Sequence, residues 1–217
     1  MTGQDLTKKQ RLATDLYCLT AGEYSRGRCN AQVVGAMIRA GVKIIQYREK
    51  DKKLAAKYAE CLEIREMTRR AGVTFIVNDD IHVAMLVGAD GVHIGQDDLP
   101  IEAVRRLVGE EMIIGLSTHS PRQAREAVER GADYIGVGPI FKTRTKKDVC
   151  EPVGLEYLDY AVQNVNIPFV AIGGIKESNV GDVVSRGAKC IAMVTEIVGA
   201  EDVEEKIKNI RRKLRNT

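Results

Sequence analysis

Residues 88–98 read GADGVHIGQDD, and this stretch holds every part of a unit that recurs along the chain. Gly88 ends an amphipathic segment, and glycine fits the left-handed backbone position that closes a helix before the next strand. The run at 91–94 is short and largely apolar, which is typical of a β-strand. Polar residues follow directly at 96–98. The stretch therefore predicts a helix end, a strand and a polar loop.

The same unit repeats through the sequence. Comparable glycine breaks stand at Gly41, Gly72, Gly131 and Gly187. The apolar runs that we predict as strands lie at 16–19, 43–46, 74–77, 91–94, 112–115, 134–137, 169–172 and 190–193. Most lack polar alternation, which favours parallel strands buried on both faces. Eight such strands predict an α/β fold with a single (β/α)8 TIM barrel and a short N-terminal helix. A doubly wound open sheet is the alternative.

Composition narrows the class of protein. A chain of 217 residues with 44% hydrophobic content suits one domain over residues 1–217. The net charge of +3 predicts no nucleic-acid partner. No apolar run approaches the roughly 18 residues that span a bilayer, so we expect no membrane partner and a cytoplasmic location. The five cysteines show neither C-x-x-C nor zinc spacing. The oligomeric state stays open, a homo-oligomer included.

Two carboxylates indicate a metal ion. In this fold the catalytic groups lie at the carboxyl ends of the strands, and Asp79 and Asp98 follow two neighbouring predicted strands. One or two carboxylates, with substrate phosphates and waters, commonly hold Mg²⁺. Alternatively, Asp80 and Asp98 cap the following helices, Asp98 just ahead of Pro100.

Cations near this metal site predict a diphosphate. Arg48 and Lys50 stand two apart on the predicted second strand and should point to the same side. With Lys146 and a divalent ion they would stabilise charge on a departing diphosphate. Pairing with neighbours such as Glu49 inside the barrel is the alternative.

A second anion site is indicated at the same rim. The predicted sixth loop carries Thr143, Arg144, Thr145, Lys146 and Lys147, whose hydroxyl and cationic groups donate to phosphate. Gly173 and Gly174, and the segment at 194–195, follow the last two strands, where barrels commonly bind phosphate. A solvated loop and a tight turn are the plainer interpretations of these two segments.

The histidines show no metalloprotease or triad pattern. His93 lies within an apolar run and is expected to be a hydrogen-bonded barrel residue. His119 lies on the rim, where its role stays open.

Six motifs in order resemble the thiamine phosphate synthase family. They are QYREK at 46–50, NDD at 78–80, HIGQDD at 93–98, GLSTH at 115–119, GPIFKTRTK at 138–146 and GGI at 173–175. With the strand pattern, the resemblance covers nearly the whole chain. It implies a transferase that couples hydroxymethylpyrimidine diphosphate with hydroxyethylthiazole phosphate, giving thiamine phosphate and diphosphate.

The resemblance also implies roles for individual residues. Mg²⁺ would be bound by Asp79 and Asp98, and the diphosphate would be bound by Arg48, Lys50, Asn78 and Lys146. The pyrimidine and its surroundings would be contacted by Gln46 and Ser117. The thiazole phosphate would be bound by Thr143, Thr145, Gly174 and the backbone of Val194 and Thr195. The expected catalytic residues are Arg48, Lys50, Ser117 and Lys146. The implied mechanism is dissociative: diphosphate leaves first, and a neutral ring nitrogen then attacks the cation without a general base.

One departure from the family pattern concerns the last strand. The family usually reads V-S-A-I there, whereas this chain has V-T-E-I at 194–197. A Glu196 carboxylate beside a phosphate would oppose binding unless it points away. Two other functions compete with the synthase: a thiazole tautomerase-like isomerase with His119 as acid and base, and a non-catalytic barrel that binds thiamine precursors.

Overall fold

Eight parallel strands form a barrel in the computed structural model, which describes residues 6–143, 145 and 150–215. The strands are β1 (Tyr17–Leu19), β2 (Ile44–Tyr47), β3 (Thr74–Asn78), β4 (Gly91–Ile94), β5 (Ile113–Thr118), β6 (Tyr134–Val137), β7 (Phe169–Ile172) and β8 (Ile191–Ala192). They pair in chain order, and a parallel bridge between Leu16 and Ile191 joins the last strand to the first. The predicted (β/α)8 barrel is confirmed, and the open sheet is wrong.

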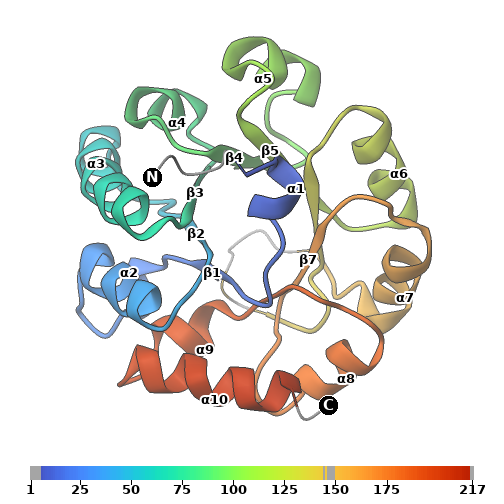
Figure 1. The fold of residues 1–217 in the computed structure, drawn as a ribbon. Coiled ribbons are helices and arrows are strands. Elements are labelled where there is room, and N and C mark those ends of the chain that lie inside the picture. The colour runs from blue at the N-terminus through green and yellow to red at the C-terminus, as the bar shows by residue number, and fades with distance from the viewer. Residues whose placement is uncertain (1–5, 144, 146–149, 216–217) are drawn as a thin grey trace.

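Helices surround the strands (Figure 1). They are α1 (Lys8–Arg11), the 3-10 turn η1 (Gly22–Tyr24), α2 (Asn30–Arg39), α3 (Leu54–Ala71), α4 (Ile81–Val87), α5 (Ile101–Val108), α6 (Pro121–Glu129), α7 (Gly154–Asn164), α8 (Val180–Ser185), α9 (Val194–Val198) and α10 (Val203–Arg215). The five glycine breaks read from the sequence all have positive φ, as helix ends closed by glycine require. None of the helices in the described ranges is long and apolar enough to cross a membrane.

The short helix α1 covers the amino end of the barrel. Lys8 pairs with Asp133 just before β6 at 3.1 Å, and Arg11 pairs with Asp90 just before β4 at 3.0 Å. Leu12 packs with the residues inside the barrel. The predicted N-terminal helix is therefore confirmed, and it leaves the carboxyl end of the barrel for a site.

Strand ends differ from the prediction at two places that matter for the site. Strand β2 ends at Tyr47, so the prediction that Arg48 and Lys50 lie on this strand is wrong. The backbone hydrogen bonding of β2 stops here, because the Arg48 amide donates to the Thr20 hydroxyl at 2.9 Å instead of to a backbone carbonyl. Strand β5 runs on to Thr118, so Ser117 lies within a strand and faces β6 at Gly136.

The barrel interior is packed by side chains that include two tyrosines. Tyr17 and Tyr134 are almost fully buried among apolar residues of the strands. A Cβ atom at Gly115 would lie 2.1 Å from the Tyr134 ring, so glycine in β5 makes the room that this ring fills. The five cysteines are free thiols, three of them buried.

Candidate active site

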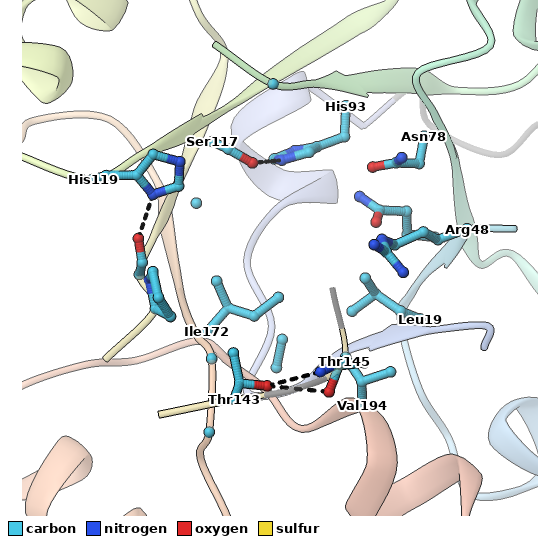
Figure 2. A pocket seen from close by; sticks show the side chains of 18 of the residues that line it. Leu19, Arg48, Asn78, His93, Ser117, His119, Thr143, Thr145, Ile172 and Val194 are labelled. Atoms are coloured by element: carbon cyan, nitrogen blue, oxygen red, sulfur yellow. Dashed lines mark hydrogen bonds between the residues drawn. The ribbon is translucent and has the colours of Figure 1, made fainter. Parts of the chain in front are cut away.

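A pocket of about 1010 Å³ opens at the carboxyl ends of the strands. Twelve of the predicted site residues line it: Gln46, Arg48, Lys50, Asn78, Asp79, Asp98, Ser117, Thr143, Thr145, Gly174, Val194 and Thr195. Figure 2 shows Arg48, Asn78 and Ser117 on one side of this pocket and Thr143, Thr145 and Val194 on another. The remaining predicted site residue, Lys146, lies outside the described residues, as do Arg144 and Lys147.

Asp79 is placed at the mouth of the pocket by a left-handed backbone turn and by an ion pair. Its φ of 61° is unusual for a residue other than glycine. Its amide donates to the His93 carbonyl at 2.9 Å, which fixes the turn against β4. Lys50 pairs with one oxygen, Oδ2. The other oxygen has no hydrogen-bond partner within the described part of the chain.

Asp98 is anchored in a similar way by its own loop. Its Oδ2 accepts a hydrogen bond from the Gly95 amide at 2.6 Å. The capping alternative is wrong, because α5 begins only at Ile101 after Pro100, and Asp98 accepts no hydrogen bond from its first amides. Asp80 makes no side-chain cap on α4 either, and instead accepts from Lys57 at 2.8 Å.

The two pocket carboxylates suit a cation that is bound together with a ligand. Asp79 and Asp98 both line the pocket, and each uses one carboxylate oxygen in a protein contact. Within the described ranges, no group of three or more His, Cys, Asp or Glu side chains is placed to hold a metal by itself. Mg²⁺ fits this donor set, because substrate phosphates and waters commonly complete its coordination.

Arg48 is available to an anion. The alternative that it pairs with Glu49 is wrong, because Glu49 accepts from the Gly22 amide and from Asn30, both at 2.9 Å. These contacts tie the loop after β2 to η1 and α2. The Arg48 guanidinium has no ion pair among the residues that the structure describes, and it projects toward the pocket (Figure 2).

His93 and Ser117 are joined by a hydrogen bond of 2.9 Å between Nε2 and Oγ. The Nδ1 atom of His93 lies 2.9 Å from the Tyr134 hydroxyl, as expected for a hydrogen-bonded barrel residue. The Tyr134 hydroxyl lies 2.7 Å from that of Tyr17, which accepts from Gln46 Nε2 at 3.0 Å. Sequence reasoning missed both tyrosines because it counted them as apolar strand residues.

His119 supports the loop after β6. Its Nδ1 donates to the Gly138 carbonyl at 2.6 Å, and its amide donates to Gln123 Oε1 at 2.7 Å. A carbonyl only accepts, so Nδ1 carries the hydrogen and Nε2 is the ring nitrogen left for other contacts. His119 lines the pocket from this position (Figure 2).

The glycine pair after β7 is required by close approach of the sixth loop. Gly173 and Gly174 have φ values of 97° and 66°. The Phe141 amide donates to the Gly173 carbonyl at 2.9 Å, and a Cβ atom at Gly174 would lie 2.6 Å from the Lys142 carbonyl oxygen. The two glycines therefore allow the loop that carries Thr143 to pack against the end of β7. The Thr145 amide donates to the Thr143 hydroxyl at 3.3 Å.

Glu196 is directed toward α10. One oxygen lies 4.0 Å from the amino group of Lys206, which also donates to Glu177 at 2.6 Å. Among the described residues Val194 and Thr195 line the pocket, and Glu196 does not. The Glu196 carboxylate therefore points away from the pocket, so it does not oppose a phosphate bound there.

The sequence is similar to known proteins over most of its length. A family model described as thiamine monophosphate synthase matches residues 16–197. The chain is 67% identical over 200 residues to a thiamine-phosphate synthase of Pelotomaculum thermopropionicum, with 92% of each chain covered. It is 55% identical over 198 residues to that of Dictyoglomus thermophilum, covering 91% of this chain and 89% of the relative.

A solved structure gives the same result. Thiamine phosphate pyrophosphorylase from Pyrococcus furiosus superposes with a TM-score of 0.86 at 34% identity, covering 95% of this chain and 98% of that one. The matched residues include every strand of the barrel and all the motifs that line its pocket. The chain belongs to the thiamine monophosphate synthase family.

Proposed function

We propose that the pocket is the active site of a transferase that joins hydroxymethylpyrimidine diphosphate to hydroxyethylthiazole phosphate, giving thiamine phosphate and diphosphate. Membership of the family supports this activity. The observation that carries the assignment is the convergence of Arg48, Lys50, Asn78 and two carboxylates on one pocket that also holds a threonine and glycine segment. One part suits a diphosphate and the other a monophosphate.

The diphosphate would bind at the ends of β2 and β3. Arg48 and Lys50 supply positive charge and Asn78 an amide donor, with Lys146 as a further cation from the sixth loop. These groups stabilise the negative charge that develops as the carbon–oxygen bond to the diphosphate breaks. The tie between Glu49 and η1 keeps Arg48 in place, so little reorganisation is required when charge forms.

Asp79 and Asp98 would hold Mg²⁺. When bound, this ion neutralises phosphate oxygens and favours departure of the diphosphate. The chain contributes the fixed orientation of the two carboxylates, one held by Lys50 and the other by the Gly95 amide.

The pyrimidine would lie deeper, between Gln46 and Ser117. Apolar side chains of Leu19, Ile172 and Ala192 line the same pocket and exclude water from the reacting carbon. A dissociative reaction needs this exclusion, since water would otherwise capture the methylene cation. The neutral thiazole nitrogen attacks that cation, so no general base is required.

The thiazole phosphate would bind at the opposite side of the pocket. Thr143 and Thr145 offer hydroxyl groups, and Gly174 and the Val194–Thr195 backbone offer amide donors. The carboxylate of Glu196 is turned to Lys206 and does not oppose the anion.

The test is direct. The purified chain is incubated with both substrates, with and without Mg²⁺, and thiamine phosphate is followed by mass spectrometry. Product that depends on Mg²⁺ supports the proposal. A folded chain that binds both substrates and forms no product would contradict it, and assays for thiazole isomerisation and simple precursor binding would then separate the isomerase from the non-catalytic barrel.

A further inference from the structure

A continuous chain of hydrogen bonds crosses the barrel interior and has both ends in the pocket. It runs from Gln46 through Tyr17, Tyr134 and His93 to Ser117, with contacts of 3.0, 2.7, 2.9 and 2.9 Å. The five side chains come from five different strands, β2, β1, β6, β4 and β5. Its ends line the pocket, whereas the two tyrosines in its middle are buried beneath it.

The donors and acceptors give the chain a direction. Gln46 donates its amide N–H to the Tyr17 oxygen. The Tyr17 hydrogen then has one acceptor among the described residues, the Tyr134 oxygen. If Tyr134 donated to Tyr17 instead, the Tyr17 hydrogen would be buried without a partner, which is costly. Tyr134 therefore accepts from Tyr17.

The same reasoning fixes the tautomer of His93. The Tyr134 hydroxyl donates its own hydrogen to Nδ1, so a neutral imidazole carries its hydrogen on Nε2 and donates it to Ser117. Burial raises the pKa of the Tyr17 and Tyr134 phenols well above the usual value, so both keep their hydrogens near neutral pH. Ser117 accepts from His93 and has its own hydrogen left to donate.

We propose that Tyr17, Tyr134 and His93 are positioning residues that set the polarity of the pyrimidine site. They hold Gln46 with its Nε2 turned to the barrel interior, so that its carbonyl is the acceptor offered to the pocket. They hold Ser117 as a donor into the pocket. A ring with an amino donor and a ring-nitrogen acceptor, such as an aminopyrimidine, matches these two groups. The inference rests on the proposed function. Tyr17 and Tyr134 are buried beneath the pocket, and His93, which lines it, is argued to act through Ser117.

The strands make room for this chain. Gly115 in β5 leaves the space that Tyr134 occupies, whereas a Cβ atom at Gly136 in β6 would make only an ordinary contact with the His93 ring at 3.6 Å. The ring centroids of His93 and Tyr134 are 5.4 Å apart, and those of Tyr17 and Tyr134 are 5.8 Å apart. Packing therefore restricts rotation of all three rings and keeps the hydrogen bonds aligned.

The first readout is the tautomer of His93, which does not depend on activity. The full-length protein is labelled with nitrogen-15 histidine, and the His93 signals are identified by their loss in the His93→Gln variant. In the wild type we expect Nδ1 without hydrogen and Nε2 with it. Tyr134→Phe removes the donor to Nδ1 and is expected to produce a mixture of tautomers. Hydrogen on Nδ1 in the wild type would overturn the proposal, since the chain would then run in the opposite direction.

The second readout is kinetic, with a matched control. Tyr157 in α7 is also buried, and its hydroxyl lies 2.6 Å from that of Thr118, outside the chain described above. Tyr134→Phe is expected to lower kcat/KM for the pyrimidine diphosphate about tenfold, with KM for the thiazole phosphate unchanged within about twofold. Tyr157→Phe should alter neither value beyond about twofold.

Equal kinetic effects of the two variants would reduce the chain to a structural role and overturn the proposal. Tyr17→Phe provides a further test, because it leaves the link from Tyr134 to His93 intact. It should preserve the tautomer while raising KM for the pyrimidine diphosphate. If the purified protein forms no thiamine phosphate at all, the proposed function fails. The histidine spectrum still decides whether the direction of the hydrogen bonds is right.

Discussion

Lys50 and Asp79, which follow neighbouring strands of the barrel, form an ion pair at the mouth of the pocket. The lysine side chain is 48% exposed, so solvent screens the pair and it adds little to stability. The ion pair instead fixes the positions of its two groups. It places a cation and a carboxylate side by side where a diphosphate and a divalent ion would bind.

Replacing Lys50 is therefore expected to separate activity from stability. Lys50→Ala should leave the Tm within about 3 °C of the wild type, while kcat falls about a hundredfold because charge on the leaving diphosphate is less stabilised. Thermal unfolding and steady-state assays measure the two effects. Lys52→Ala is a matched control, since Lys52 pairs with Glu60 outside the pocket lining. Comparable loss of kcat in both variants would contradict a specific role for Lys50.

Removal of the Asp98 carboxylate is expected to abolish Mg²⁺-dependent turnover without unfolding the chain. Asp98→Ala deletes an exposed side chain and one hydrogen bond to the Gly95 amide, so the barrel should stay folded. Circular dichroism checks the fold, and Mg²⁺ titration of the rate checks the metal. Glu111→Ala is the control, because Glu111 is exposed and lies outside the pocket lining. Full activity of Asp98→Ala would remove the metal assignment.

The fold and most of the pocket could be predicted because buried parallel strands read as apolar runs and their polar ends follow directly in sequence. Strand ends were less certain, since they depend on contacts between distant segments. The hydroxyl of Thr20 stops β2 before Arg48, and pairing with β6 carries β5 through Ser117. Neither contact leaves a signal in the local pattern.

The directions of side chains also could not be predicted from the sequence. Tyr17 and Tyr134 were read as apolar strand residues, because only the closed barrel brings their hydroxyls to 2.7 Å. The sequence also left the direction of Glu196 open. That direction depends on Lys206 in α10, which packs beside α9.

Glu196→Ala is expected to leave the affinity for the thiazole phosphate unchanged or slightly higher. The carboxylate faces Lys206 and not the pocket, so its removal takes no contact from the ligand. KM for the thiazole phosphate should stay within about twofold of the wild type. Thr143→Val is the opposite case and should raise this KM about tenfold through loss of a hydroxyl donor. A marked loss of affinity in Glu196→Ala would mean that the carboxylate makes a needed contact.

Glu60 predicts a pH dependence of stability. Partial burial raises its pKa, but hydrogen bonds from Lys52, Tyr47 and Asn30 outweigh this effect, and the net pKa is lowered. A lowered folded-state pKa adds stability above the unfolded value of about 4.3, and this stability is lost as pH falls through the folded value.

The destabilisation caused by Glu60→Gln should therefore be present at pH 7 and shrink as the pH falls below about 4. Urea unfolding across this range measures the difference. Glu63→Gln, an exposed change on the same helix, is the control and should have little effect at either pH. A destabilisation by Glu60→Gln that stays constant down to pH 3 would contradict the predicted linkage.

Gly174 combines two constraints that a pair of alanine variants can separate. Its φ is +66°, and a Cβ atom would also meet the Lys142 and Phe141 carbonyl oxygens at 2.6 and 2.7 Å. Gly72 has a similar φ of +63° with nothing within 4 Å of its Cβ position. Gly72→Ala therefore reports backbone strain alone, with an expected cost of about 1–2 kcal/mol.

Gly174→Ala carries the same strain and must also push the sixth loop away. We expect it to lower stability by more than Gly72→Ala and to raise KM for the thiazole phosphate at least about tenfold, because Thr143 and Thr145 move with the loop. Gly72→Ala should leave that KM unchanged. Urea unfolding and initial-rate assays on both variants measure the comparison. If both variants kept the wild-type KM, contact between the glycine pair and the sixth loop would have no part in shaping the phosphate site.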